Sequence, residues 1–239
     1  MTLKSMEPFG LALKEYYEGN LQAKVIFHRD DGHQDDYYVS HCFRRSSDFS
    51  SIEKYAISLC QGKVLDIGAG VGPHSLELQK MGLDVWAIDI SSHACDIMVK
   101  RGVKNVRCTN VYDLDEGKFD TILLMGRAIG FVGDLTGLKL FLTHSKRLLN
   151  PEGIILLDSI DVSITEIPEH LAYHERNRKL GRYFGEIELQ MEYNRIFGER
   201  FKLLHIDPQT LIKSAQEDSM SCEILSKEEN GNFLAKVSM

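Results

Sequence analysis

The segment with the clearest chemical meaning is a glycine-rich run, Asp66-x-Gly68-x-Gly70-x-Gly72. It follows a short apolar stretch at residues 64–67, which predicts a strand, and precedes a helical pattern at residues 74–81. Glycines at such a junction let the chain turn sharply and let a ligand approach the backbone closely. The run therefore predicts a ligand-binding loop, the alternative being a turn that binds nothing.

An acidic residue, Asp89, ends the next apolar stretch, at residues 84–90. A carboxylate there can accept two hydrogen bonds from the hydroxyl groups of an adenosyl ribose. A dinucleotide fingerprint would require a third glycine where this chain has Pro73. The acidic Asp66 beside the loop also favours a cationic ligand over a pyrophosphate. The pattern thus favours S-adenosylmethionine (SAM) over NAD as the ligand.

Through this loop and this acid, residues 63–160 resemble the class I SAM-dependent methyltransferases. The resemblance implies SAM as cofactor and S-adenosylhomocysteine as product. It also implies that the loop receives the methionine part of SAM and that the acid ending the second strand holds the ribose. Together with the residue after the fourth strand, the expected cofactor-binding residues are Asp66, Gly68, Ala69, Gly70, Asp89, Ile90, Asn110, Val111, Met125 and Arg44.

Four of these residues have specific expected roles. By the resemblance, Ile90 packs on the adenine, and Asn110 with Val111 reaches the adenine from the end of the third strand. Asn110 could instead be an ordinary turn residue. Arg44 is expected to face the methionine carboxylate, the alternative being a surface charge.

Methyl transfer from a sulfonium depends mainly on alignment in a dry pocket, and a base is needed only when the nucleophile begins protonated. The candidates for catalytic residues are His41 and Arg127. Arg127 follows the fourth strand, so it either binds a substrate carboxylate or points to solvent. His74 and His205 are weaker candidates, expected to be exposed and packed, respectively. Two acids after the fifth strand, Asp158 and Asp161, are too few to predict a metal site.

The amino-acid composition of the chain limits the kinds of partner that it is expected to bind. The 239-residue chain has a formal net charge of −7, which disfavours a nucleic-acid substrate. One basic cluster, at residues 176–182, is expected to be a solvated helix face. Five cysteines without a Cys-x-x-Cys pair, no signal peptide and no long apolar segment predict a cytoplasmic protein without membrane contact. We expect a monomer or a homodimer.

Strands and helices alternate from residue 63 onward, with strands expected at 64–67, 84–90, 103–109, 121–125 and 153–157. Apolar strands of this kind predict a mostly parallel sheet covered on both faces. An Asn-Gly turn near residue 230 predicts a closing antiparallel hairpin. The expected fold is α/β, a Rossmann-like doubly wound sheet of about seven strands.

Two further segments complete the expected organisation. Residues 1–62 are predicted to form a helical lead-in, or cap, before the SAM-binding domain at 63–239. Within that domain, residues 161–206 are predicted to form an insertion with a β-hairpin over the site. The resulting hypothesis is a SAM-dependent methyltransferase acting on a small molecule. The alternatives are a non-catalytic SAM-binding module and an NAD(P)-dependent oxidoreductase, and the methyl acceptor stays open.

Overall fold

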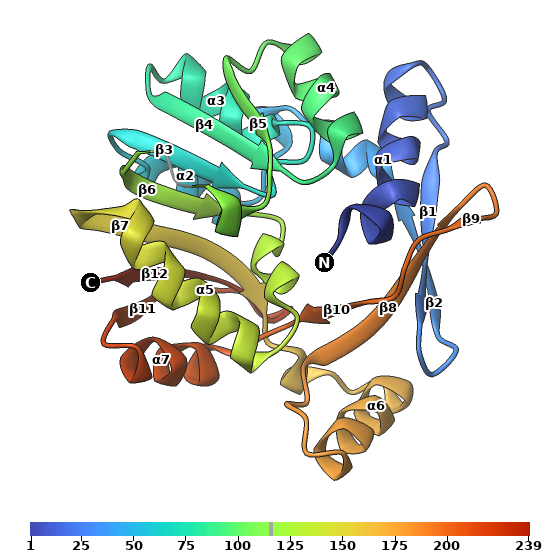
Figure 1. Cartoon of the computed structure of the whole chain (residues 1–239). Coiled ribbons are helices and arrows are strands. Elements are labelled where there is room, and N and C mark those ends of the chain that lie inside the picture. The colour runs from blue at the N-terminus through green and yellow to red at the C-terminus, as the bar shows by residue number, and fades with distance from the viewer. Residues whose placement is uncertain (115–116) are drawn as a thin grey trace.

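A seven-stranded sheet forms the centre of the protein (Figure 1), whose computed structural model describes residues 1–114 and 117–239. The strand order is β11-β12-β7-β6-β3-β4-β5. The five strands from β3 to β7 run parallel, whereas β12 runs antiparallel to both β7 and β11. The strands are β3 (Lys63–Ile67), β4 (Asp84–Asp89), β5 (Asn105–Cys108), β6 (Phe119–Leu124), β7 (Leu149–Ile160), β11 (Ser221–Lys227) and β12 (Asn232–Ser238). The predicted Rossmann-like sheet with its closing hairpin is confirmed.

Helices cover both faces of this sheet because its strands bury side chains on both sides. On β4, Val85 and Ala87 pack toward one face, and Trp86 and Ile88 pack toward the other. The first face is covered by α2 (Ser51–Leu59), α3 (Pro73–Lys80) and α4 (Ser92–Arg101), and the second by α5 (Leu135–Leu148) and α7 (Pro208–Glu217). Within the described residues, no helix has the length and apolar character needed to cross a membrane.

A second sheet joins two segments that lie far apart in the sequence. Its order is β10-β8-β1-β2, with β9 paired to β8. Strand β1 pairs antiparallel with β8, and Ile26 lies opposite Glu192. The strands are β1 (Lys24–Arg29), β2 (Gln34–Tyr38), β8 (Glu186–Tyr193), β9 (Ile196–Phe197) and β10 (Phe201–Leu204). The lead-in thus holds two strands besides its helices, and they share one sheet with the insertion, which also carries α6 (Pro168–Lys179).

The first helix, α1 (Leu3–Tyr17), connects the two parts of the molecule. Thr2 and Ser5 form a capping box that satisfies its first free backbone amides. One face of α1 packs on the second sheet, and another face packs on α4. At the contact with α4, Gly10 lies against Ser91 and His93. A side chain at Gly10 would meet the Ser91 hydroxyl at 2.7 Å, so the close approach of the two helices requires glycine.

Candidate functional site

The glycine loop lies at the carboxyl end of β3, where the chain turns into α3. The backbone amides of Gly68 and Ala69 donate to the carbonyl of Ile88 at 3.0 and 3.1 Å, which ties the loop to the neighbouring strand. Gly68, Gly70 and Gly72 have φ angles of 68°, 57° and 76°, in the left-handed region that favours glycine. No atom lies within 4 Å of the position that a Cβ on Gly70 would take, so the loop leaves open space there.

Asp89 lies beside this loop at the end of β4. Its Oδ2 accepts a hydrogen bond from the amide of Gly70 at 2.9 Å, and its Oδ1 accepts one from the amide of Ser91 at 2.8 Å. Burial raises the pKa of Asp89 to about 6, although these amides act in the opposite direction. The carboxylate therefore connects the loop to the start of α4 and keeps lone pairs free for a ligand.

Asp66 lies beneath the loop, not in the cavity. Its carboxylate is buried and accepts a hydrogen bond from the Ser75 hydroxyl at 2.6 Å. Burial raises its pKa. Because Ser75 belongs to α3, the Asp66 contact fixes the helix that follows the loop. The structure thus separates Asp66 from the other expected cofactor-binding residues.

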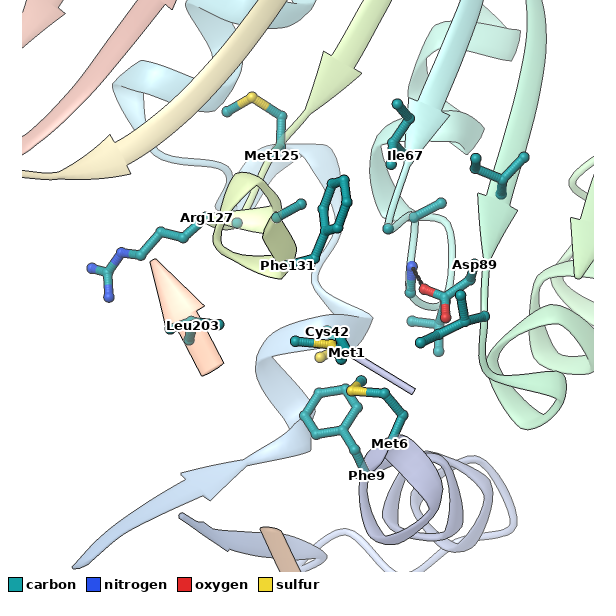
Figure 2. Close-up of a pocket in the computed structure, with 18 of the residues that line it drawn as sticks. Met1, Met6, Phe9, Cys42, Ile67, Asp89, Met125, Arg127, Phe131 and Leu203 are labelled. Carbon is teal, nitrogen blue, oxygen red and sulfur yellow. Dashed lines mark hydrogen bonds between the residues drawn. The ribbon is translucent and has the colours of Figure 1, made fainter. Parts of the chain in front are cut away.

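A cavity of about 390 Å³ opens between the loop and the second sheet (Figure 2). The part next to the loop contains the other residues expected from the sequence to bind the cofactor, namely Gly68, Ala69, Gly70, Asp89, Ile90, Asn110, Val111, Met125 and Arg44. Asn110 also caps the short helix η3 (Val111–Asp113), where its side chain accepts a hydrogen bond from the amide of Tyr112 at 3.1 Å. Asn110 is therefore both a turn residue and part of the cavity lining.

The far side of the cavity is apolar. Helix α1 and the strands β1, β8 and β10 contribute the side chains that form it. We call this set the apolar wall; its members are Met6, Phe9, Phe27, Leu189, Met191, Phe201 and Leu203. Two tyrosines of the insertion have partners outside the cavity. The Tyr183 hydroxyl donates to Asp207 at 2.5 Å, and the Tyr193 hydroxyl donates to Glu15 at 2.6 Å.

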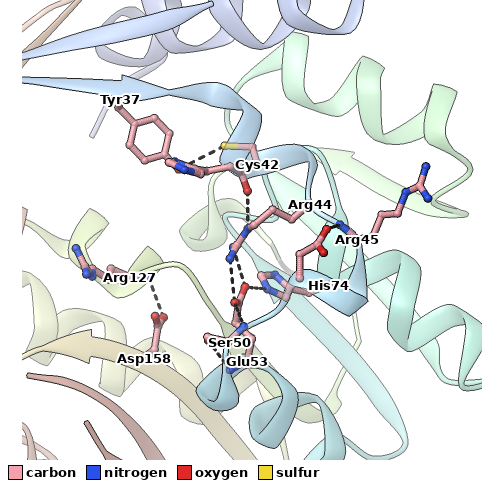
Figure 3. A network of polar contacts seen from close by, with 11 residues as sticks. Tyr37, Cys42, Arg44, Arg45, Ser50, Glu53, His74, Arg127 and Asp158 are labelled. Carbon is pink, nitrogen blue, oxygen red and sulfur yellow. Dashed lines mark hydrogen bonds and ion pairs between the residues drawn. The ribbon is translucent and has the colours of Figure 1, made fainter. Parts of the chain in front are cut away.

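Arg44 lies at the edge of the cavity in a network of charged groups (Figure 3). Its guanidinium donates two hydrogen bonds to Glu53, at 3.1 and 2.8 Å, and Nε2 of His74 lies 2.8 Å from the same carboxylate. Burial alone would raise the pKa of Glu53. The hydrogen bonds from His74 and the Ser50 amide, together with the charge of Arg44, instead lower it to about 2.

Two members of this network were not anticipated from the sequence. The expectation that His74 is exposed is wrong, because the ring is buried and packs 4.9 Å from the ring of Phe49. Glu53 stands three residues after Ser50, which is the spacing of a capping box and indicates only the start of α2. No sequence pattern links Glu53 to Arg44 or to His74, because the lead-in must fold over the loop to bring them together.

The two candidates for catalytic residues, His41 and Arg127, both line the cavity. The ring of His41 lies edge-on to Tyr37, with centroids 5.7 Å apart. Arg127 has a φ of 62°, and its amide donates to Asp158 at 2.8 Å. Its guanidinium donates to Asn232 at 2.9 Å and extends away from Asp89 and Met6 (Figure 2). Burial raises the pKa of Asp158 to about 6.

A further histidine, His205, also reaches the cavity. Its Nδ1 is buried and has no hydrogen-bond partner. Burial and the charge of Arg127 lower its pKa to about 3, so the imidazole is neutral. The sequence predicted a packed or edge histidine on a strand and gave no sign that Nδ1 would be buried without a partner. Among all the described residues, this site included, no three His, Cys, Asp or Glu side chains are grouped so that they could hold a metal ion.

Comparisons with known proteins add independent observations. A family model described as a methyltransferase domain matches residues 65–157. The chain is 31% identical to a SAM-dependent methyltransferase from Bacteroides fragilis whose crystal structure contains S-adenosylhomocysteine. That match has a TM-score of 0.86 and covers 100% of this chain and 97% of that chain.

Two other relatives are more distant. A glycine/sarcosine N-methyltransferase from Halorhodospira halochloris is 26% identical over 104 residues. The match spans 40% of this chain and only 39% of that enzyme. The sugar N-methyltransferase KedS8 from Streptoalloteichus is 14% identical, with a TM-score of 0.55 over 83% of this chain and 91% of that chain, which shows a shared fold.

Proposed function

The chain belongs to the SAM-dependent methyltransferases, and on that premise we propose that it methylates a small molecule held between the glycine loop and the apolar wall. SAM is the cofactor, and S-adenosylhomocysteine is the product. SAM supplies a methyl group carried on a positively charged sulfur. The observation that carries the proposal is one continuous cavity with the loop at one side and the apolar wall at the other.

The residues around the loop fit this cofactor. The open space at Gly70 lets a ligand approach the backbone, and Asp89 has free lone pairs for the two ribose hydroxyls. Ile90 and Val111 offer apolar contact for the adenine, with Asn110 at its polar edge. In this proposal Arg44 faces the methionine carboxylate, and its two hydrogen bonds to Glu53 hold the guanidinium at the edge of the cavity. Asp66 acts indirectly, because it supports α3 through Ser75.

The chain contributes alignment and exclusion of water. Helix α1 and the second sheet close the cavity, so an acceptor between them is held against the cofactor side in an apolar environment. The new bond forms between the acceptor atom and the methyl carbon as the bond from carbon to sulfur breaks, and a proton from the acceptor is released. His41 lies on this cavity and is the candidate to receive such a proton.

A small acceptor is supported by three observations. The cavity is small, about 390 Å³, and the apolar wall offers no row of basic groups for a phosphate backbone. The net charge of −7 acts against nucleic acid at long range. Two relatives are named for the N-methylation of small molecules, glycine or sarcosine and a sugar. A non-catalytic SAM-binding module would not need the space between the cofactor side of the cavity and the apolar wall.

The test is an assay of the purified protein with isotopically labelled SAM and a metabolite extract, followed by identification of the labelled product. We expect label in a small-molecule fraction. The Asp89→Ala variant should lose this transfer, and Asp96→Ala, which removes an exposed carboxylate on α4, should keep it. Label appearing only in nucleic acid or protein would overturn the small-molecule proposal.

A further inference from the structure

The cavity has few charges available to an acceptor. Of the described residues that line it, Asp89 is the only carboxylate, and it lies on the cofactor side. Of the two lining arginines, Arg44 is neutralised by Glu53, and the exposed Arg127 extends its guanidinium away from Asp89 and Met6 toward Asn232 (Figure 2). A charged acceptor in contact with the apolar wall would lose its hydration without gaining a counter-ion, which is costly. The lining therefore favours an uncharged acceptor with an apolar body.

His205 is a polar group that such a molecule would meet beside the apolar wall. It directly follows β10, two of whose residues belong to the apolar wall. The backbone amide of His205 donates to the carbonyl of Gly185 at 2.9 Å. A Cβ on Gly185 would lie 2.0 Å from the His205 carbonyl oxygen, so the two backbone segments are closely packed and fix the position of the histidine.

The ring of His205 is left with unused hydrogen-bonding capacity. Its Nδ1 is buried without a partner although the residue lines the cavity. A buried polar atom in this state costs free energy until a ligand satisfies it. Burial and the nearby charges of Arg127 and His174 keep the ring neutral by lowering its pKa to about 3. A neutral ring exchanges hydrogen bonds with uncharged groups and offers no charge to a carboxylate.

We propose that His205 binds the methyl acceptor, which is an uncharged molecule with an apolar body and one hydroxyl or amino group hydrogen-bonded to the imidazole ring. This inference rests on the proposed function, because it assigns the substrate class of the same cavity. An amine bound in this way is in its neutral form, which retains the lone pair that attacks the methyl group. The apolar wall would hold the body of the molecule, and His205 would set its rotation within the cavity.

The test uses the full chain saturated with S-adenosylhomocysteine and three probes: phenol, toluene and benzoate. Phenol and toluene share size and shape and differ in the hydroxyl group, whereas benzoate carries a charge at pH 7. Binding of each probe is measured by calorimetry or ligand-observed NMR. We expect phenol to bind about fivefold more tightly than toluene, which corresponds to one net hydrogen bond of about 1 kcal/mol. Benzoate should bind more weakly than both.

Two variants connect this preference to the histidine. His205→Phe keeps a ring and removes the nitrogens, so it should bind toluene more tightly than phenol, whose hydroxyl would be buried without a partner. His205→Asn replaces Nδ1 by an amide group and should recover part of the preference. His170→Phe, the same change at a histidine on α6 that does not line the cavity, is the matched control and should retain the full preference. A preference for phenol that persists in His205→Phe would overturn the role of His205.

If His205→Phe does not fold, the parent protein alone still tests whether His205 binds the hydroxyl group. In the spectrum of protein labelled with ¹⁵N histidine, phenol should shift a ring-nitrogen signal of His205 more than toluene does. Equal affinity for phenol and toluene, or benzoate binding as tight as phenol, would overturn the substrate class. Failure of the parent to bind S-adenosylhomocysteine at the outset would instead overturn the proposed function, so the two failures are distinguishable.

Discussion

Arg44 and Glu53 form a two-point contact in which both guanidinium Nη atoms donate to the two carboxylate oxygens, at 3.1 and 2.8 Å. The contact ties the segment after β2 to helix α2, and His74 on α3 shares the same carboxylate. Glu53 thus holds three elements together at the edge of the cavity. Its low pKa, about 2, records how strongly these partners favour the ionised form.

Replacing Glu53 by Gln should destabilise the protein by about 2 kcal/mol at pH 7, because the buried partners lose a charge-assisted acceptor. The folded-state pKa lies below the ordinary 4.5, so this stabilisation is present above pH 4.5 and is lost as the pH falls toward 2. Urea unfolding at several pH values measures it. The difference between parent and variant should shrink over that range, and Glu217→Gln, an exposed carboxylate, should show little difference at any pH.

Affinity for S-adenosylhomocysteine should depend on pH through Asp89. Burial raises the pKa of this carboxyl to about 6, and the ionised form is the better acceptor for the ribose hydroxyls. Affinity should therefore be constant above pH 7 and fall below it, by about tenfold in total once the carboxyl is protonated. Calorimetry from pH 5 to pH 8 measures this dependence.

Two variants isolate the Asp89 effect. Asp89→Asn should bind about tenfold more weakly at pH 7 and lose the pH dependence. Asp158 has a pKa raised to the same value but does not line the cavity, so Asp158→Asn should keep the dependence. A pH dependence retained in Asp89→Asn would contradict the assignment of this carboxylate to the ribose.

The loop glycines should separate binding from stability. Gly70 and Gly72 both have a positive φ, so alanine costs about 1 kcal/mol of backbone strain at either position. At Gly72 the added methyl would also lie 2.8 Å from Val103, whereas at Gly70 it would enter the open space beside Asp89. We expect Gly72→Ala to lose more stability in urea and Gly70→Ala to lose more affinity for S-adenosylhomocysteine. The reverse order would contradict the placement of the ligand at Gly70.

Docking of α1 on α4 should depend on Gly10. In Gly10→Val the new side chain would collide with Ser91 and His93, so α1 should separate from α4. We expect faster hydrogen exchange across residues 3–17 and weaker binding of toluene, because Met6 and Phe9 of the apolar wall would leave the cavity. Lys14→Val places the same residue type at an exposed position of α1 and controls for helix propensity. Unchanged exchange in Gly10→Val would show that this contact does not hold α1 in place.

The sequence predicted best those features that depend on neighbouring residues in the chain. Asp66, the glycine loop and Asp89 belong to one strand–helix–strand unit, whose geometry follows from local pattern and from the right-handed connection of parallel strands. The closing hairpin followed in the same way from its Asn-Gly turn. Asp66 shows how far such local prediction reaches. The pattern predicted that Asp66 lies beside the loop, but only its contact with Ser75 shows that its carboxylate faces the interior.

Features built from distant segments were not predictable in this way. Whether His74 is exposed depends on Phe49 and Glu53, which the lead-in brings over α3. Whether Nδ1 of His205 finds a hydrogen-bond partner depends on the residues that surround the cavity, and these come from segments that no local pattern connects. The pairing of β1 with β8 was likewise invisible, because alternating polarity marks a strand without naming its partner.

That pairing also bears on the order in which the protein is made. The strand β1 leaves the ribosome early, yet its neighbour β8 is synthesised only after most of the central sheet. Because contacts between distant segments form late, we expect a nascent chain to hold β1 and β2 as an unfinished edge until β8 and β10 emerge. Chains truncated before residue 186 would then lack the part of the apolar wall that β8 and β10 supply, and the exposed edge would be prone to aggregation.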